Sequence, residues 1–216
     1  MIVPKKDGTS RFCVDFRRVN AVTKKDVYPL PRIDDILDTL GGSKYFSTLD
    51  LSSGYWQIEL DPATRDRSAF TSHCGLYEFT RMPFGLCNAP ATFQRLMQVV
   101  LSGLEGKVCF VYIDDILVCS KTFEEHIDHL KQVLHRLRKA GLTLKPRKCC
   151  FLKKEVNYLG HVISGTGIAP DPTKTQKVYD FPVPTDLTKL YQFLGSHPIT
   201  DSSSLDLQKL LILCIN

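Results

Sequence analysis

The chain has 216 residues, of which 43% are hydrophobic, and a formal net charge of +5 at pH 7. These values are typical of a globular protein with one domain, or one domain with an appendage. No apolar run reaches the roughly 18 residues of a membrane span, and the opening stretch MIVPKKDGTS lacks the apolar core of a signal peptide. We therefore expect an intracellular protein, cytoplasmic or nuclear, that is neither secreted nor bound to a membrane.

The net charge hides an uneven distribution of charged side chains. Residues 1–32 carry eight Lys and Arg against three Asp and Glu, and residues 131–154 carry nine against none. Residues 33–130 carry seven basic and fourteen acidic side chains. Charged runs are usually solvated surface. Two basic flanks around an acidic middle would also suit a bound polyanion, with carboxylates at the centre for metal ions.

The cysteine and histidine residues show no pattern typical of a zinc site or a disulfide framework. The eight cysteines have no C-x-x-C spacing, and most lie in apolar segments, as reduced core thiols do. His126 and His129 are three residues apart in a predicted helix, but no further ligands accompany them. We expect no metal site at these two histidines.

The first predicted elements in chain order are a hairpin and a short helix. KKDGTSRFCVDF predicts a hairpin, because Asp7-Gly8 favours the positive-φ turn and alternation follows toward Phe16. LPRIDDILDTLGG predicts a helix with Pro31 in its first turn and Gly41-Gly42 at its end.

Two strands and a second helix are predicted next. KYFSTLDL and YWQIEL are the strands, and Trp56, Ile58 and Leu60 alternate in the second. NAPATFQRLMQVVLSG predicts a helix capped by Asn88. The residues expected on its apolar face are Phe93, Leu96, Met97, Val100 and Leu101.

The stretch CFVYIDDILVCS places two carboxylates, Asp114 and Asp115, inside an apolar, β-branched run. A straight buried strand would force at least one of them into the core without a partner. The sequence therefore predicts two strands, Val108–Tyr112 and Ile116–Ser120, with both carboxylates at the hairpin tip. Asp residues also form turns for purely structural reasons, so this pattern alone assigns no function.

The strongest predicted helix follows in TFEEHIDHLKQVLHRLRKAG, with a capping box formed by Thr122 and Glu125. Its predicted buried stripe consists of Ile127, Leu130, Leu134 and Leu137. VNYLGHVIS then predicts a tight hairpin, and PDPTKTQKVYDFPVPT a proline-rich connection. Helices and hairpins are interspersed, and no Gly-rich phosphate loop follows a strand, so the predicted fold class is α+β.

A third carboxylate, Asp50, ends the apolar run YFSTLDL. If it meets the acidic hairpin, three carboxylates converge from separate parts of the chain. Such a group could hold two divalent cations about 4 Å apart, which suits phosphoryl and nucleotidyl transfer. Spacing alone does not show that they converge.

Six blocks together resemble the reverse transcriptases of gypsy-type LTR retrotransposons and their retroviral relatives. They are SRFCVDFRRVN, STLDLSSGYWQIEL, YEFTRMPFGLCNAPATFQ, VYIDDILVCS, GLTLKPRKC and NYLGHVIS, in the order and approximate spacing of that family. The resemblance runs from about residue 2 to residue 195. It implies a right-hand polymerase with a palm and partial fingers, in which the thumb is absent or incomplete.

The resemblance also implies roles for individual residues. Asp50, Asp114 and Asp115 match the catalytic, metal-binding triad of the palm, with Leu51 included among the metal-binding residues. The implied cofactor is a pair of Mg²⁺ ions, or Mn²⁺. Lys148 matches a lysine proposed to protonate the leaving pyrophosphate.

Further roles concern the nucleotide and the primer. Lys5 or Lys6, with Arg11, resemble residues that clasp the incoming triphosphate, although basic residues there also suit a soluble surface. Tyr55 matches a steric gate against the ribose 2′-hydroxyl, and Phe84 takes the position beside the nucleotide. The hairpin turn that contains Tyr158, Leu159, Gly160 and His161 resembles the element that positions the primer.

The resemblance implies an RNA-directed DNA polymerase fragment of a Pol polyprotein, whose partners are an RNA or DNA template with its primer and deoxynucleoside triphosphates. We expect fingers and palm in residues 1–163, a proline-rich connection and the start of a following region in 164–195, and a divergent tail in 196–216. The family's fingers begin before VPKKDG, so the chain is expected to be truncated at both ends. A nucleic-acid-binding relic without turnover, or an unexpressed remnant of a mobile element, is the alternative.

Overall fold

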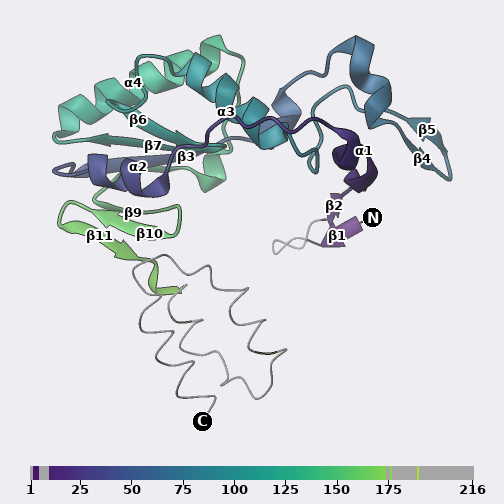
Figure 1. The fold of residues 1–216 in the computed structure, drawn as a ribbon. Helices are drawn as coiled ribbons and strands as arrows, with labels where there is room; N and C mark the ends of the chain where they lie inside the picture. Colours follow the sequence, from purple (N-terminus) through teal and green to yellow (C-terminus); the bar gives the residue numbers. More distant parts are fainter. Residues whose placement is uncertain (1, 5–9, 174–175, 177–188, 190–216) are drawn as a thin grey trace. The chain divides into compact units, whose positions relative to one another are not determined.

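The computed structural model describes residues 2–4, 10–173, 176 and 189. The chain divides into two compact units, residues 1–169 and 170–216. Nearly all described elements belong to the first unit (Figure 1). No helix among the described residues combines the length and apolarity needed to cross a bilayer.

A four-stranded antiparallel sheet forms the centre of the first unit. Its strands are β3 (Tyr45–Asp50), β6 (Cys109–Tyr112), β7 (Asp115–Ser120) and β8 (Cys150–Lys153), in the spatial order β6-β7-β3-β8. β3 pairs with β7 over its whole length, from Tyr45 opposite Ser120 to Asp50 opposite Asp115. The sheet therefore joins segments that are far apart in the sequence.

Strand residues alternate between two cores because successive side chains point to opposite faces of the sheet. On one face, Leu49, Val111 and Ile116 pack with α3 (Ala89–Val100) and α4 (Phe123–Lys139). On the other face, Phe46 and Leu117 pack with α2 (Ile33–Thr39) and the hairpin of β9 (Glu155–Tyr158) and β10 (His161–Ser164). Figure 1 shows α4 and α2 on opposite sides of the sheet.

Smaller elements complete the first unit. Two-stranded ribbons are formed by β1 (Ile2–Pro4) with β2 (Ser10–Phe12), and by β4 (Phe70–Ser72) with β5 (Gly75–Tyr77). α1 is Arg17–Val22, and β11 (Gly167–Pro170) joins the β9–β10 sheet. Three 3-10 helices are described: η1 (Gly54–Gln57), η2 (Pro62–Ser68) and η3 (Pro146–Lys148).

Several predicted elements are confirmed. The hairpin strands in IVP and SRF pair, although their predicted turn at Asp7-Gly8 lies outside the described residues. The predicted helix is present at residues 33–39, but Pro31 precedes its N-cap residue Arg32 and does not lie in the first turn as predicted. The Thr122 and Glu125 capping box at the start of α4 forms as predicted. The proline-rich connection falls mostly outside the described residues.

Three predictions were wrong in instructive ways. YWQIEL is not a strand: it contains η1, and Trp56 is 46% exposed. The side chain of Asn88 does not cap α3 but bonds a distant segment instead. The buried stripe of α4 is rotated from the predicted one and consists of His126, Leu130, Val133 and Leu137.

Candidate active site

The acidic hairpin turns one residue earlier than predicted. Tyr112 pairs with Asp115 in the β6–β7 ladder, so the two-residue turn consists of Ile113 and Asp114, and Asp115 begins β7. Ile113 has φ +55°, a strained conformation for a β-branched residue. Something must therefore hold this turn in place.

A buried glutamine of α3, which the sequence reasoning missed, bonds the backbone where β6 enters the turn. Gln94 is fully buried; its Nε2 donates to the Val111 carbonyl oxygen at 3.3 Å, and its Oε1 accepts from the Ile113 N–H at 2.7 Å. The sequence held a weak signal, because Gln94 is the one polar residue between Phe93 and Met97 on the side of α3 that faces the core. Gln94 thus fixes the backbone that presents Asp114.

Asp50 lies at the end of β3, directly opposite Asp115 in the antiparallel register. Directly paired residues place their side chains on the same face of a sheet. Asp114 is the adjacent turn residue, and its field contributes to the titration of Asp115. The topology thus brings the three sequence-predicted carboxylates to the same end of the sheet.

Lys148, the fourth predicted catalytic residue, lies in η3 and contacts this carboxylate group. Its Nζ lies 2.8 Å from Oδ2 of Asp50, and its side chain is 57% exposed. The Lys145 N–H donates to the Asp50 carbonyl oxygen, and the Lys148 N–H to that of Lys145. Backbone and side-chain bonds thus both tie this segment to the end of β3.

A second glutamine strengthens the same attachment. Gln57 in η1 donates from Nε2 to the carbonyl oxygens of Ser52 and Thr143, and its Oε1 accepts from the Thr143 N–H at 2.7 Å. Leu51, which is 2% exposed, forms a bridge with Leu144 beside it. The Leu51 side chain is therefore part of the core, and only the backbone carbonyl of this residue could bind a metal ion.

The charges of the site shift the pKa values of its members. Loss of hydration raises the pKa of Asp114, and the charge of Asp50 adds to this. Loss of hydration also raises the pKa of Asp115, with further contributions from Asp114 and Asp50. The hydrogen bond from Lys148 to Asp50 raises the pKa of the lysine. The region thus holds more negative charge than its own lysine neutralises.

A cleft lies beside the carboxylates, between the ends of β3 and β7 and the β9–β10 hairpin. Its lining includes Asp50, Asp115, Lys148, Tyr158 and Leu159. Tyr158 is 3% exposed, and its hydroxyl donates to the Asp115 carbonyl oxygen at 3.4 Å. Burial raises the pKa of this phenol, so Tyr158 remains a neutral donor.

The tip of this hairpin consists of the other residues predicted to position a primer. Leu159 and Gly160 both have positive φ and form the turn, and His161 begins β10. The hairpin is therefore attached to β7 through Tyr158, while its tip is formed by Leu159 and Gly160.

Of the aromatic residues predicted at the nucleotide, Tyr55 lies near Asp114. The Tyr55 ring contacts Phe84 at a centroid distance of 5.0 Å and Phe93 at 5.6 Å. Burial and the charge of Asp114 raise the pKa of Tyr55. Gly54 leaves little room in between, because a Cβ there would lie 3.3 Å from the Asp114 Cβ. The predicted gate residue thus lies next to the turn that contains Asp114.

The structure does not place every predicted residue. Lys5 and Lys6 lie outside the described residues, and Arg11 is described only as a backbone position in β2, opposite Val3. Within the described part of the chain, no three His, Cys, Asp or Glu side chains are grouped so that they could hold a metal ion as they stand. The seven cysteines described are free thiols.

An antiparallel sheet with carboxylates at a strand end and at the facing turn is the arrangement of a right-hand polymerase palm, a class of nucleotidyltransferases. The family model "Reverse transcriptase (RNA-dependent DNA polymerase)" matches residues 3–163. The chain belongs to this reverse transcriptase family, whose members generally depend on divalent metal ions.

The similar curated proteins are Pol polyproteins of mobile elements. The chain is 44% identical over 199 residues to the Retrovirus-related Pol polyprotein from transposon 297 of Drosophila melanogaster, covering 90% of this chain and 19% of the relative. The polyprotein from transposon gypsy of the same organism is 42% identical over 185 residues, with 86% and 18% covered. The chain thus spans less than a fifth of the length of these two relatives.

Solved structures of foamy viral protease-reverse transcriptase share the fold. The protein in complex with double-stranded DNA matches with a TM-score of 0.83 and 32% identity, covering 90% of this chain and 34% of that one. The protein in complex with an RNA/DNA hybrid matches with a TM-score of 0.78 and 32% identity, covering 90% and 26%. The chain therefore has the palm and fingers fold of a reverse transcriptase.

Proposed function

We propose that this chain is the part of a gypsy-type retrotransposon Pol polyprotein that extends a primer 3′-hydroxyl, copying an RNA or DNA template. The observation that carries the proposal is the pairing of Asp50 with Asp115 across β3 and β7, with Lys148 bonded to Asp50. Family membership supports the same activity. In this reaction the primer oxygen bonds to the α-phosphorus of a nucleoside triphosphate, and the bond from that phosphorus to the pyrophosphate breaks.

The residues of the site fit divalent cations by their chemistry. Asp50, Asp114 and Asp115 supply the hard carboxylate oxygens that Mg²⁺ and Mn²⁺ prefer. Burial and mutual repulsion raise the pKa values of Asp114 and Asp115. A bound cation would reduce this repulsion. These three residues, with the Leu51 carbonyl, would hold two metal ions. Such ions, when bound, lower the pKa of an attacking hydroxyl and stabilise the leaving phosphate oxygens.

Lys148 is proposed to supply a proton to the leaving pyrophosphate. Asp50 raises the pKa of the lysine, so the Nζ group stays protonated near neutral pH. Its side chain is more than half exposed and can turn from Asp50 toward a bound phosphate. Replacing Lys148 by Leu is expected to slow the chemical step more than it weakens nucleotide binding.

Nucleotide selection is proposed to rest on Tyr55 and Phe84, whose rings are in contact. Tyr55 would exclude a ribose 2′-hydroxyl, and Phe84 would lie beside the base or sugar. Lys5, Lys6 and Arg11 are proposed to neutralise the triphosphate. The β9–β10 hairpin, with Tyr158, Leu159, Gly160 and His161, would position the primer.

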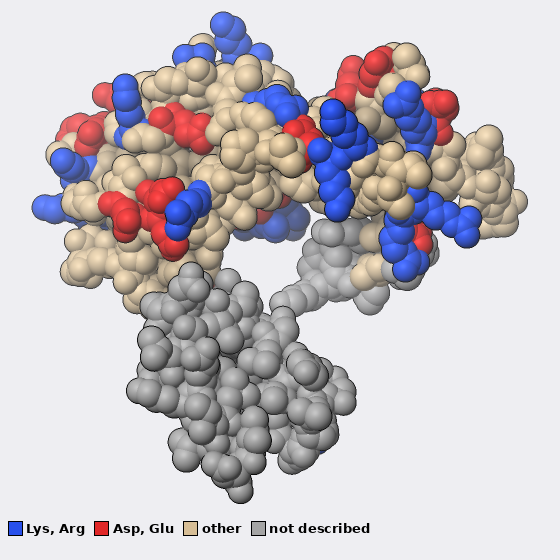
Figure 2. Space-filling model, in the orientation of Figure 1, with Lys and Arg blue, Asp and Glu red and all other residues tan. Residues whose placement is uncertain are grey.

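Template and primer binding is supported by the solved relatives, whose titles name complexes with double-stranded DNA and with an RNA/DNA hybrid. Figure 2 shows Lys and Arg side chains gathered over the part of the molecule that contains α1 and the segment after it, where Arg17, Arg18, Lys24 and Lys25 are exposed. Such a surface suits the phosphate backbone of a nucleic acid.

The decisive experiment is primer extension by the purified chain on matched RNA and DNA templates, with Mg²⁺ and deoxynucleoside triphosphates. The unmodified chain is expected to add nucleotides, and Asp114→Asn to lose the activity. Binding of the primer–template without extension by the unmodified chain would contradict the proposal and indicate a nucleic-acid-binding relic. Equal extension by Asp114→Asn would remove that residue from the catalytic group.

A further inference from the structure

Two asparagine side chains bridge α1 and the start of α3 in opposite directions. Asn20, in α1, donates from Nδ2 to the Gly85 carbonyl oxygen at 2.8 Å, and its Oδ1 accepts from the Cys87 N–H at 2.9 Å. Each amide half thus bonds one backbone group of the loop before α3. Asn20 thus makes one donor and one acceptor bond to the backbone of this loop, as a paired strand does.

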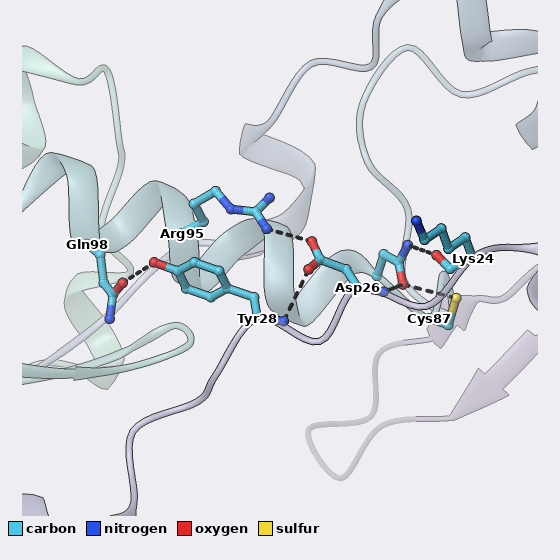
Figure 3. A network of polar contacts seen from close by, with 7 residues as sticks. Lys24, Asp26, Tyr28, Cys87, Arg95 and Gln98 are labelled. Atoms are coloured by element: carbon cyan, nitrogen blue, oxygen red, sulfur yellow. Dashed lines mark hydrogen bonds and ion pairs between the residues drawn. The ribbon is translucent and has the colours of Figure 1, made fainter.

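Asn88 makes the reverse attachment. Its Nδ2 donates to the Lys24 carbonyl oxygen at 2.9 Å, and its Oδ1 accepts from the Asp26 N–H at 3.0 Å. Figure 3 shows these bonds between the start of α3 and the segment that follows α1. We refer to Asn20 and Asn88 with their four backbone partners as the asparagine clasp. Because each asparagine holds the other's segment, α1 and the loop before α3 are fixed to each other.

The clasped loop carries an aromatic ring of the proposed nucleotide site. Phe84 precedes Gly85, and its ring contacts Tyr55 at 5.0 Å and Trp56 at 6.0 Å between centroids. Gly85 has φ +99°, and a Cβ there would lie 3.4 Å from the Phe16 ring. The path of the loop is therefore set by close packing against residues near α1 and by the bonds to Asn20.

We propose that the asparagine clasp positions Phe84 against Tyr55 and so sets the sugar selectivity for the incoming nucleotide. Asn20 and Asn88 are positioning residues, since their bonds reach only backbone groups. This inference rests on the proposed function, in which Tyr55 and Phe84 face the nucleotide. Loss of a clasp bond would let the Phe84 ring move and open room near the sugar.

The same segment supplies matched controls. Asp26 is paired with Arg95 at 2.7 Å, and the Tyr28 hydroxyl bonds the Gln98 side chain. These contacts also attach the segment after α1 to α3 (Figure 3), but none of them involves residues 84–87. Tyr28→Phe should therefore remove one contact between this segment and α3 and leave all four clasp bonds in place.

The test compares Asn20→Asp with Tyr28→Phe by two measurements. Asn20→Asp keeps the acceptor for Cys87 but replaces the donor to Gly85 with a carboxylate oxygen that repels its carbonyl. Trp56 is the only tryptophan of the chain, so its fluorescence and its quenching by acrylamide report on the nearby Phe84 ring without any need for activity. The second measurement is the ratio of kcat/KM for a deoxynucleotide to that for the matching ribonucleotide.

Asn20→Asp is expected to change Trp56 emission and to lower the sugar discrimination about tenfold, since small displacements in a site have large effects on rate. Tyr28→Phe is expected to leave both unchanged. If circular dichroism shows that Asn20→Asp does not fold, Asn20→Ser is measured instead. Unchanged Trp56 emission, or a uniform fall in kcat with the discrimination intact, would overturn the inference.

Failure of the proposed function is distinguishable from failure of this inference. If the unmodified chain extends no primer, the proposed function fails and sugar selectivity has no meaning for the chain. The Trp56 fluorescence measurement alone then tests whether the clasp positions Phe84. A spectral change in Asn20→Asp but not in Tyr28→Phe supports it, and identical spectra of the three proteins refute it.

Discussion

The carboxyl groups of Asp114 and Asp115 lie where their charge is disfavoured, because loss of hydration and neighbouring carboxylates raise both pKa values. The folded protein therefore binds these protons more tightly than the unfolded chain does. It follows that their contribution to the free energy of unfolding is greatest at acid pH and is lost as pH rises through the raised pKa values. The ionised carboxylates thus lower the stability of the fold near neutral pH.

We predict that Asp115→Asn raises the melting temperature at pH 7.5 while it abolishes primer extension. The variant removes a disfavoured charge, and each gain of about 1 kcal/mol in the free energy of unfolding raises the melting temperature by about 2–4 °C in a domain of this size. The gain should vanish near pH 3, where the wild-type carboxyl is itself protonated. Calorimetry at both pH values measures this, and a lower melting temperature of the variant at pH 7.5 would contradict it.

Gln94 is a single buried amide that holds the turn containing Asp114. We predict that Gln94→Leu lowers the free energy of unfolding by about 1–3 kcal/mol, because the Val111 carbonyl and the Ile113 N–H lose their bonds to its side chain. Urea denaturation measures the change. Gln132→Leu, at an exposed position of α4, is the control and should stay within about 0.5 kcal/mol of wild type. Equal effects of the two substitutions would remove the special role of Gln94.

At the scale of elements, α4 illustrates the limits of pattern reading. Its caps and length were predictable from local sequence, since Thr122 and Glu125 are three residues apart. Its buried face was not, because the His126 side chain is held by hydroxyl groups of two strands of the sheet. Its Nε2 lies 2.7 Å from the Ser47 hydroxyl of β3, and its Nδ1 lies 3.0 Å from the Ser120 hydroxyl of β7. No local period reveals such a buried polar group.

The same reason accounts for the other errors. YWQIEL alternates as a strand would, but Gln57 bonds Thr143 and turns the segment into η1. Asn88 has the residue type and place of a helix cap, but tertiary partners take both halves of its amide. Short local signals correctly predicted the hairpins and the strand end at Asp50. They failed where an amide is satisfied by a remote backbone.

The buried His126 predicts a specific pH dependence of stability. Burial lowers its pKa below the ordinary 6.5, so the fold keeps the ring neutral while the unfolded chain takes up a proton. The stability is therefore full above pH 6.5 and falls as pH decreases below it, by up to about 1.4 kcal/mol per pH unit. His126→Gln should flatten this decline between pH 6.5 and 5, as measured by urea unfolding. His135→Gln, exposed on the same helix, should retain the wild-type slope, and a wild-type slope in His126→Gln would refute the assignment.

At the scale of the whole molecule, basic and acidic side chains are concentrated in different parts of the chain. The basic flanks, residues 1–32 and 131–154, include α1 and the C-terminal half of α4, whereas the acidic middle contains α2 and the three proposed metal-binding carboxylates. Figure 2 shows acidic side chains on the part that contains α2 and basic ones over α1. Much of the binding energy for a polyanion should then come from phosphate contacts with the flanks rather than from base contacts.

We therefore predict weak binding of primer–template duplexes that is indifferent to sequence and falls steeply with salt. Each Lys or Arg that neutralises a phosphate adds about 0.9 to the slope of log affinity against log salt concentration. Removing two such contacts with Lys24→Gln and Lys25→Gln, both exposed, should reduce that slope by about 1.8. Fluorescence anisotropy of a labelled duplex between 50 and 300 mM salt, about the range in which such contacts are resolved, gives the slopes.

Lys107→Gln is the matched control, because Lys107 is exposed but lies outside both flanks. It removes one positive charge, whereas the Lys24 and Lys25 variant removes two, so an effect of net charge alone would reduce the slope in the control by about half as much. An unchanged slope in Lys107→Gln with a reduced slope in the Lys24 and Lys25 variant locates the phosphate contacts on the α1 flank. Equal slopes in all three proteins would mean that the flanks are ordinary solvated surface and that the duplex is held elsewhere.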